Sequence, residues 1–329
     1  MMNKDAKIWV AGCNGLVGGA VHTALLQKGY GKTIGTDRED FDLTDPYSTD
    51  RFFNTARPEY AVLAAAKVGG IQANDTYPAD FIRINLQIQT NVIDAAFRYG
   101  VKKLLFLGSS CIYPKLAPQP LKEEHLLSGK LEPTNDAYAL AKIAGIVMCK
   151  SYNRQHGTNF IAAMPTNLYG PGDNFDLETS HVLPAMIRKF HEAKVGGTSQ
   201  VELWGSGRPR REFLFVKDLA DALVFMLDNF DAGRGHEAEQ MFANVGVGTD
   251  VSIRELAETV QKAVGFAGEI RWNSEMPDGT PQKLLDVSRL DALGWRAKTS
   301  LEKGIAETYA WYLQHSRRDP AEAQSGITA

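Results

Sequence analysis

Four side chains with complementary acid–base chemistry lie in the middle of the chain. Ser109 and Cys111 are two residues apart in the stretch LGSSCIYPKL, which follows a short apolar run. In an extended segment residues i and i+2 point to the same side, so both groups can face one pocket. Tyr138 and Lys142 are four residues apart in a helical pattern and share one helix face. These residues are candidates for a single catalytic site.

The tyrosine and the lysine suggest proton transfer to a carbonyl group. A lysine ammonium beside a phenol favours the phenolate, so we expect Lys142 to lower the pKa of Tyr138. Such a tyrosine passes a proton to or from a carbonyl oxygen during hydride transfer. This spacing is also common on solvated helix faces. The catalytic interpretation gains weight because Ser109, at the end of the fourth predicted strand, can hydrogen-bond the same oxygen.

A glycine-rich turn near the start of the chain predicts a dinucleotide site. Gly12, Gly15 and Gly18 follow the first apolar run and precede a helical pattern. Glycines permit a tight turn and a close approach of the backbone to a diphosphate, and the helix N-terminus offers free N–H groups. The alternative is a glycine-rich turn without a ligand. The strand–turn–helix setting favours the cofactor.

The elements that must position these residues alternate regularly in the first half. Short apolar runs such as KIWVAG, EYAVLAAA and KKLLFLGSS are each followed by a helical pattern. This order predicts an α/β fold with a Rossmann-type doubly wound parallel sheet. A long loop after Pro165 breaks the rhythm. We expect a dinucleotide-binding domain at 1–165 with a segment returning near 213–245, a smaller C-terminal substrate-binding lobe at 166–315, and a mobile tail at 316–329.

Composition narrows the class of protein. The 329 residues are 44% hydrophobic and carry a formal net charge of −3, so there is no electrostatic case for a nucleic-acid partner. No apolar run approaches the roughly 20 residues of a membrane span, and no signal-peptide pattern is present. Cys13, Cys111 and Cys149 are typical of free thiols in a reducing compartment. No Cys/His cluster has zinc-ligand spacing. We expect a cytoplasmic enzyme without a metal.

The stretches around these residues resemble the GDP-L-fucose synthase family, within the extended short-chain dehydrogenase/reductase superfamily. The resemblance runs from about residue 8 to about residue 311 and rests on AAAKVGGIQANDTYPADFIRIN, LLFLGSSCIYPK, EPTNDAYALAKIAG, MPTNLYGPGDNF, WGSGRPRREFLFVKDLADA and PDGTPQKLLDVSRL. It implies two lobes, a homodimer and conversion of GDP-4-keto-6-deoxy-D-mannose to GDP-L-fucose. That conversion is a 3,5-epimerisation followed by reduction at C4 with NADPH.

The implied reaction gives Cys111 a role. C3 and C5 lie beside a ketone, so removing either proton gives an enolate that Ser109 and Tyr138 can stabilise. Inversion needs a base and an acid on opposite faces of the sugar. The resemblance implies Cys111 as the base, which requires a lowered thiol pKa, and His181 as the acid. Taken alone, Cys111 is equally typical of a small buried hydrophobe, and His181 of a polar helix start.

The resemblance also implies the binding residues. Arg211 could pair with phosphate oxygens and Trp204 could pack on the ligand, although surface charge and a core tryptophan are the alternative; Arg210 stays open beside Arg211. The implied substrate contacts are Lys189, Trp204, Arg211 and Asp278. The implied cofactor contacts are Gly12, Cys13, Asn14, Gly15, Leu16, Val17, Gly18, Asp37, Arg38, Leu107, Gly108, Ser110, Lys142, Pro165, Thr166, Asn167, Leu168 and His181.

The residues after the second predicted strand leave the choice between NADP(H) and NAD(H) contested. Arg38 can meet a 2′-phosphate, but Asp37, about 20 residues beyond the glycine loop, would ordinarily bind a free 2′-hydroxyl. Asn14 adds to the conflict, because some relatives place an arginine inside that loop. We favour NADPH, with Arg38 on the phosphate and Asp37 turned away.

Single residues distinguish the expected activity from other functions that the same fold can have. A 4,6-dehydratase would carry Thr-Asp-Glu where this chain has Ser-Cys-Ile, and a simple 4-epimerase needs neither Cys111 nor His181. A non-catalytic dinucleotide sensor could lose Tyr138 or Lys142, and both are present.

The homodimer is expected to pair two helices, around residues 85–98 and 138–152. Both helices carry apolar residues on more than one face. The residues that suggest this are Ile88, Val92, Ile93, Ile146 and Val147.

Overall fold

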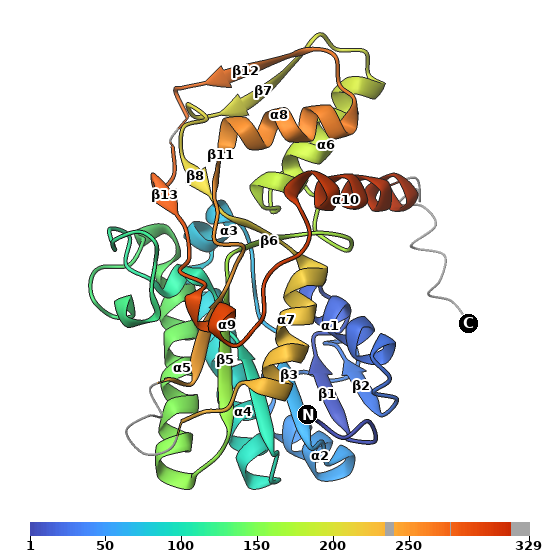
Figure 1. The fold of residues 1–329 in the computed structure, drawn as a ribbon. Helices are drawn as coiled ribbons and strands as arrows, with labels where there is room; N and C mark the ends of the chain where they lie inside the picture. Colours follow the sequence, from blue (N-terminus) through green and yellow to red (C-terminus); the bar gives the residue numbers. More distant parts are fainter. Residues whose placement is uncertain (234–239, 277, 317–329) are drawn as a thin grey trace.

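A six-stranded parallel sheet forms the centre of the computed structural model, which describes residues 1–233, 240–276 and 278–316. The expected tail from residue 317 onward lies outside the described residues. The strand order is β10-β5-β4-β3-β1-β2, and it reverses between β1 and β3, where ligands bind in such sheets (Figure 1). The strands are β1 (Ile8–Ala11), β2 (Thr33–Thr36), β3 (Tyr60–Leu63), β4 (Lys103–Leu107), β5 (Phe160–Pro165) and β10 (Phe242–Val245).

Helices cover both faces of this sheet, as the alternation of its side chains requires. Ile8 and Val10 face α1 (Leu16–Gln27) and α7 (Val216–Asn229). Trp9 and Ala11 face the other layer, which consists of α2 (Pro46–Ala56), α4 (Pro78–Arg98) and α5 (Asp136–His156). Strands covered on both sides read as continuous apolar runs, which is why the sequence revealed them. The expected doubly wound α/β fold is confirmed.

A second group of elements stacks at one end of the sheet and has its own core (Figure 1). Three small sheets hold it together: β6 with β9, β7 with β12, and β8 between β11 and β13. The capping box of Ser252 and Glu255 starts α8. The bounds are β6 (Asn167–Tyr169), β7 (Gln200–Trp204), β8 (Arg210–Arg211), β9 (Phe213–Phe215), β11 (Val251–Ser252), β12 (Glu269–Asn273), β13 (Gln282–Lys283), α6 (Val182–Val195), α8 (Ile253–Val264) and α10 (Leu301–His315).

The chain crosses between the two groups more often than the sequence suggested. Helix α7 packs on α1 and strand β10 extends the central sheet beside β5. A further return was not expected: α9 (Ser288–Ala292) packs on β10, and Leu290 and Trp295 join the core beneath α7. The functional division near residue 165 stays a prediction. The short connecting helices are α3 (Ile71–Thr76), η1 (Ser110–Ile112), η2 (Glu123–His125) and η3 (Pro133–Asn135).

The helices expected at a dimer interface expose less apolar surface than the sequence indicated. Only Val147 of the five apolar residues is exposed, with Leu140 nearby on α5. The homodimer therefore stays a prediction, and fewer exposed apolar residues support it than the sequence indicated. The four residues that pack into the chain's own core are Ile88, Val92, Ile93 and Ile146.

Candidate active site

The serine, cysteine, tyrosine and lysine with acid–base chemistry meet at the carboxyl end of β4. Ser109 lies two residues after β4 and caps η1, where its Oγ accepts a hydrogen bond from the Cys111 backbone N–H at 3.3 Å. Ser109 also hydrogen-bonds the Tyr138 hydroxyl and the Cys111 thiol. Ser109 thus connects the expected proton donor of the reduction with the expected base of the epimerisation.

Helix α5 brings its two polar side chains to this edge because it lies close to the sheet. A Cβ on Gly145 would come within 2.4 Å of the Phe106 ring, so only glycine permits this approach. The Lys142 Nζ donates a hydrogen bond to the Leu107 carbonyl at 2.8 Å and lies 5.7 Å from the centre of the Tyr138 ring. Phe81 of α4 packs edge-on against that ring at 6.2 Å. Packing therefore fixes the orientation of Tyr138 and Lys142.

Burial decides the protonation of this pair, and it corrects one expectation. Burial raises the pKa of the Tyr138 phenol above its usual range; Cys111 adds to the rise, and the Ser109 hydrogen bond opposes it. Burial also lowers the pKa of Lys142 to about 8. The pKa of Tyr138 is thus raised and not lowered as expected, because desolvation of the phenolate is the largest effect on it. The phenol is protonated at neutral pH, which is the form that can donate a proton.

Cys111 corrects a second expectation. Its side chain is buried, and burial raises the pKa of the thiol. The charge of Lys283, the Ser109 hydrogen bond and the charge of Lys142 all act in the opposite direction, with Lys283 the strongest of the three. The environment therefore contains groups that favour a thiolate, but their combined effect is smaller than the cost of desolvation.

His181 lies at the start of α6. It is the N-cap residue of that helix and follows the long loop after β6. The ring is accessible to solvent, but the protein around it and the charge of Lys283 lower its pKa below the usual value. Cys111 and His181 thus share Lys283 as an electrostatic neighbour. The structure brings both expected proton-transfer residues into range of one charge.

The glycine turn has the shape that a dinucleotide requires. Gly12 has a φ of +79°, and a Cβ there would meet the Ala65 backbone at 3.0 Å. A Cβ on Gly18 would come within 2.0 Å of the Gly12 carbonyl oxygen, so the helix can start this close to the strand only with glycine. Gly15 caps α1 without a side-chain hydrogen bond, which leaves first-turn N–H groups for a diphosphate. These residues fit the cofactor.

Asp37 is turned toward the glycine loop. Its carboxylate accepts hydrogen bonds from the Asn14 backbone N–H at 3.0 Å and from the Arg38 backbone N–H at 2.6 Å. Asp37 therefore stabilises the loop through the Asn14 backbone. Arg38 is exposed, and no ion pair of its side chain occurs within the described part of the chain. Its guanidinium is thus available for a phosphate.

The other expected cofactor residues lie along the same sheet edge. The Gly108 N–H donates to the Ala163 carbonyl at 2.9 Å. Thr166 Oγ1 and Asn167 Nδ2 both donate to the Glu212 carbonyl, at 3.2 Å and 2.8 Å. Direct cofactor contacts of these residues stay a prediction. The remaining members lie at the ends of β1, β4 and β5 or shortly after them in the chain: Cys13, Leu16, Val17, Leu107, Ser110, Pro165 and Leu168.

The expected substrate residues belong to the second group of elements. The Lys189 Nζ lies 5.7 Å from the centre of the Trp204 ring, which is 60% exposed. Asp278 accepts hydrogen bonds from the Ser206 N–H and hydroxyl at 2.8 Å and 2.6 Å, and it attracts the Arg211 guanidinium. These pairs place a flat aromatic surface and two cations on one wall.

The structure separates Arg210 from Arg211, which the sequence left open. Arg210 Nε forms an ion pair with Asp250 at 2.8 Å. Arg211 is mostly buried, which lowers its pKa, and its Nη1 donates to the Arg210 carbonyl at 2.8 Å. No ion pair of Arg211 is found among residues 1–233, 240–276 and 278–316. Arg211 is therefore the better candidate for a phosphate.

Two residues that the sequence reasoning missed complete this wall. Lys283 in β13 pairs in register with Arg211 in β8. Glu212 is fully buried and accepts hydrogen bonds from the N–H groups of Val247, Gly248 and Leu285 at 2.5, 2.7 and 3.0 Å. A glutamate directly before the apolar strand β9 was a visible signal, whereas a two-residue strand after a proline leaves no pattern that marks Lys283.

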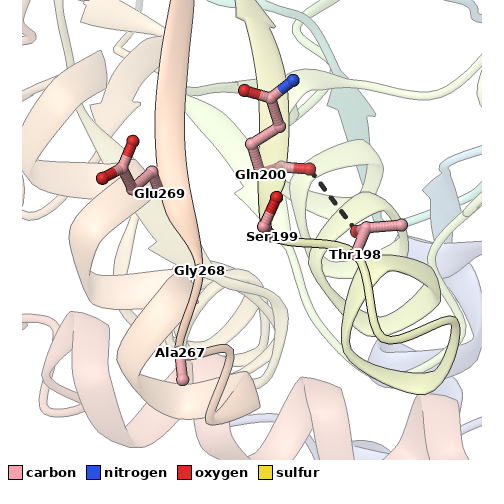
Figure 2. A pocket seen from close by; sticks show the side chains of 6 residues that line it. All are labelled: Thr198, Ser199, Gln200, Ala267, Gly268 and Glu269. Carbon is pink, nitrogen blue, oxygen red and sulfur yellow. Dashed lines mark hydrogen bonds between the residues drawn. The ribbon is translucent and has the colours of Figure 1, made fainter.

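Figure 2 shows a pocket that lies apart from this site, at one end of the β7–β12 pair. Glu269 is its single ionisable residue, and none of the candidate site residues lines it. The pocket therefore has no part in the acid–base chemistry at the end of β4. The lining residues are Thr198, Ser199, Gln200, Ala267, Gly268 and Glu269.

Neither a metal cluster nor a membrane span occurs in the described residues. No group of three or more His, Cys, Asp or Glu residues among them could hold a metal ion. None of the described helices is long and apolar enough to cross a membrane.

A parallel sheet with its glycine turn at the switch point, and a serine, tyrosine and lysine at the end of β4, define an enzyme of the short-chain dehydrogenase/reductase class. Within that class, the chain belongs to the NAD dependent epimerase/dehydratase family, whose model matches residues 8–245.

Named relatives narrow the comparison. The chain is 56% identical to GDP-L-fucose synthase 1 of Arabidopsis thaliana over 96% of this chain and 95% of the relative. It is 50% identical to GDP-L-fucose synthase of Escherichia coli over 95% and 98%. A solved GDP-L-fucose synthetase from Naegleria fowleri bound to NADP superposes with a TM-score of 0.85 at 28% identity, covering 97% of both chains. These findings confirm the resemblance that the motifs indicated.

Proposed function

We propose that this enzyme converts GDP-4-keto-6-deoxy-D-mannose to GDP-L-fucose by 3,5-epimerisation followed by NADPH-dependent reduction at C4. One observation carries the proposal: a thiol, Cys111, shares Ser109 with Tyr138 and lies in range of the same lysine charge as His181. Reduction or simple 4-epimerisation needs only the serine, tyrosine and lysine. The two GDP-L-fucose synthases at 56% and 50% identity support the same function.

The epimerase step uses the residues around Ser109. Cys111 removes a proton from C3 or C5, and the electron pair moves to the C4 oxygen as an enolate. Ser109 and Tyr138 hydrogen-bond that oxygen and stabilise its charge. His181 delivers a proton to the opposite face, which inverts the carbon.

The reduction uses the same hydrogen-bond donors. Bound NADPH supplies the hydride for C4. Tyr138, whose phenol is protonated at neutral pH, gives its proton to the C4 oxygen while Ser109 keeps that oxygen in place. Lys142 is held on the Leu107 carbonyl and stabilises the negative charge that the phenol then acquires.

The enzyme binds NADP(H) through Arg38 at the end of β2. This proposal is supported by the Asp37 carboxylate, which is engaged by two backbone N–H groups, and by the exposed position of Arg38. Arg38→Ala should weaken NADPH binding about 10- to 100-fold and leave NADH binding nearly unchanged, because a charged hydrogen bond contributes roughly 1.5–3 kcal/mol. Titration with both cofactors measures this. Equal loss for both would contradict the assignment of Arg38 to the phosphate.

Product identification tests the proposed function. The enzyme is incubated with GDP-4-keto-6-deoxy-D-mannose and NADPH, and the product is identified by NMR. We expect NADPH oxidation together with inverted configuration at C3 and C5. Oxidation with unchanged configuration would identify a plain 4-reductase, and inversion at C4 without net oxidation would identify a 4-epimerase.

We also propose a homodimer that acts in the cytoplasm. The exposed Leu140 and Val147 on α5 give the helix pair an apolar surface, and the three free cysteines suit a reducing compartment. Light scattering at micromolar concentration tests the assembly. A species of only 36.2 kDa would contradict the dimer.

A further inference from the structure

A buried glutamate lies where the second group of elements meets the central sheet. Glu212 stands between β8, which carries Arg211, and β9, whose Leu214 packs in the core beneath α7. The Arg211 guanidinium lies beside the loop that follows β12, where a Cβ on Gly279 would come within 2.8 Å of its Nη2. The two neighbouring side chains therefore contact different segments, and only Arg211 reaches the wall that is expected to bind the substrate.

The Glu212 side chain joins two segments that are far apart in the sequence. Its Oε1 accepts hydrogen bonds from the Val247 and Gly248 N–H groups at 2.5 and 2.7 Å, just after β10. Its Oε2 accepts one from the Leu285 N–H at 3.0 Å, just after β13. A Cβ on Gly246 would lie 2.2 Å from Oε1, so a glycine there makes room for the carboxylate. The side chain is fully buried, and no ion pair of it occurs in the described residues, so hydrogen bonds hold the carboxylate in place.

The Glu212 backbone binds a third segment, which follows β5. Its carbonyl accepts hydrogen bonds from Thr166 Oγ1 at 3.2 Å and from Asn167 Nδ2 at 2.8 Å. The Thr166 N–H in turn donates to the Val245 carbonyl at the end of β10, at 3.1 Å. Glu212 thus connects strand β8 to the carboxyl ends of β5 and β10, where the cofactor is expected. Because Arg211 is covalently bonded to Glu212, its distance from these strand ends depends on the same hydrogen bonds.

We propose that Glu212 is a positioning residue for the substrate, which fixes Arg211 relative to the carboxyl ends of β5 and β10. The proposal rests on the proposed function, because it takes Arg211 as the ligand of the GDP-sugar diphosphate. Arg211 also pairs with Val251 and Lys283, but all three strands of that small sheet are two residues long. Strands this short contribute few backbone hydrogen bonds, so the sheet needs the support that Glu212 gives.

A carboxylate suits this position because both of its oxygens accept hydrogen bonds. The amide of a glutamine has one oxygen and an NH₂ group that only donates. In Glu212→Gln the NH₂ group would therefore face at least one N–H group that has lost its acceptor. A buried donor without a partner is costly, so the segments should separate slightly and Arg211 should shift with them. The bonds of Thr166 and Asn167 should persist, because the backbone carbonyl that they bind is unchanged.

Titration of the enzyme with GDP alone measures this effect without turnover. Glu212→Gln should weaken GDP binding about tenfold and leave NADPH binding within about twofold of the wild type. In turnover, the KM for the GDP-sugar should rise about tenfold while kcat changes little. Equal weakening of GDP and NADPH binding would overturn the proposal, because it would indicate a general disruption between the central sheet and the second group.

A double-mutant cycle tests whether Glu212 acts through Arg211. Arg211→Met removes the expected phosphate ligand, so adding Glu212→Gln to it should weaken GDP binding by less than about twofold. A further loss of about tenfold in the double variant would overturn the proposal, because Glu212 would then act independently of Arg211. Since GDP binding needs no sugar chemistry, a failure of the proposed reaction would appear only in product identification and leave this cycle intact.

Two further variants separate positioning from a loss of stability. Gly246→Ala keeps Glu212 but displaces its carboxylate, so it should also weaken GDP binding, and it tests the proposal if Glu212→Gln does not fold. Val260→Ala on α8 opens a cavity in the core of the second group and should lower the Tm without changing GDP affinity. If Val260→Ala weakened GDP binding as much as Glu212→Gln, any destabilisation would have this effect and the proposal would be wrong.

Discussion

The inner cluster and the outer wall of the site are built in opposite ways. The inner cluster, defined as Ser109, Cys111, Tyr138 and Lys142, comes from one strand end and the next long helix. The outer wall, defined as Lys189, Trp204, Arg211 and Asp278, comes from one helix, two short strands and a loop that are scattered over about ninety residues. Reactive groups are thus fixed by a deep core, and binding groups by small sheets that can vary more freely.

This comparison predicts that substitutions in the inner cluster reduce kcat, whereas substitutions in the outer wall raise the KM for the GDP-sugar. The largest expected effect is that of Tyr138→Phe, which removes the proton donor and should slow reduction about 10²- to 10⁴-fold while NADPH binding persists. Stopped-flow measurement of NADPH oxidation checks it. Tyr152→Phe on the same helix, whose hydroxyl donates to Asp94 at 2.9 Å, should react like the wild type. Near-normal reduction by Tyr138→Phe would show that this residue of the inner cluster is not the proton donor.

Cys111→Ser should separate the two steps within the inner cluster. Because serine is a far weaker base, deuterium exchange at C3 and C5 should fall about 100-fold or more, while the ketone is still reduced without inversion. NMR of the product in deuterium oxide measures both. Cys149→Ala, a cysteine buried in α5, should keep full exchange. His181→Asn should retain some exchange but protonate the second face poorly. Wild-type exchange in Cys111→Ser would remove the thiol from the mechanism.

Arg211→Met is the matching test of the outer wall. Loss of a charged hydrogen bond to a diphosphate should raise the KM for the GDP-sugar about 10- to 100-fold, with kcat changed little. Arg210→Met loses the ion pair with Asp250 and should change KM far less. Initial rates over a range of GDP-sugar concentrations give both constants. If the two variants behaved alike, the distinction between the neighbouring arginines would be wrong.

The smallest expected effect is a pH dependence of the inner cluster. The pKa of Lys142 is lowered to about 8, and a lysine loses its charge as pH rises through its pKa. The reduction should therefore fall above pH 8, about tenfold at about pH 9. Lys142→Arg, which keeps its charge, should move the fall to higher pH. A wild-type rate that stays constant across this range would show that the ammonium is not required.

The sequence predicted the inner cluster because its spacing is local. The alternation of strands and helices, and a tyrosine four residues before a lysine, are both visible in the sequence without the structure. The protonation states could not be read this way: burial raises the pKa of Tyr138 and Cys111, and only the fold reveals that burial. Lys283 was missed for a similar reason, because its importance comes from pairing with Arg211 across about seventy residues of chain.

The return of the chain to the central sheet has a consequence for synthesis on the ribosome. After residue 165 has emerged, β5 still lacks its neighbour β10, and the face that α7 covers is open. An unpaired strand edge and an uncovered apolar face favour aggregation. The first half therefore cannot complete its fold while the second half is being made. Nascent chains stalled between residues 165 and 215 should bind chaperones strongly, and chains released after residue 297 should not.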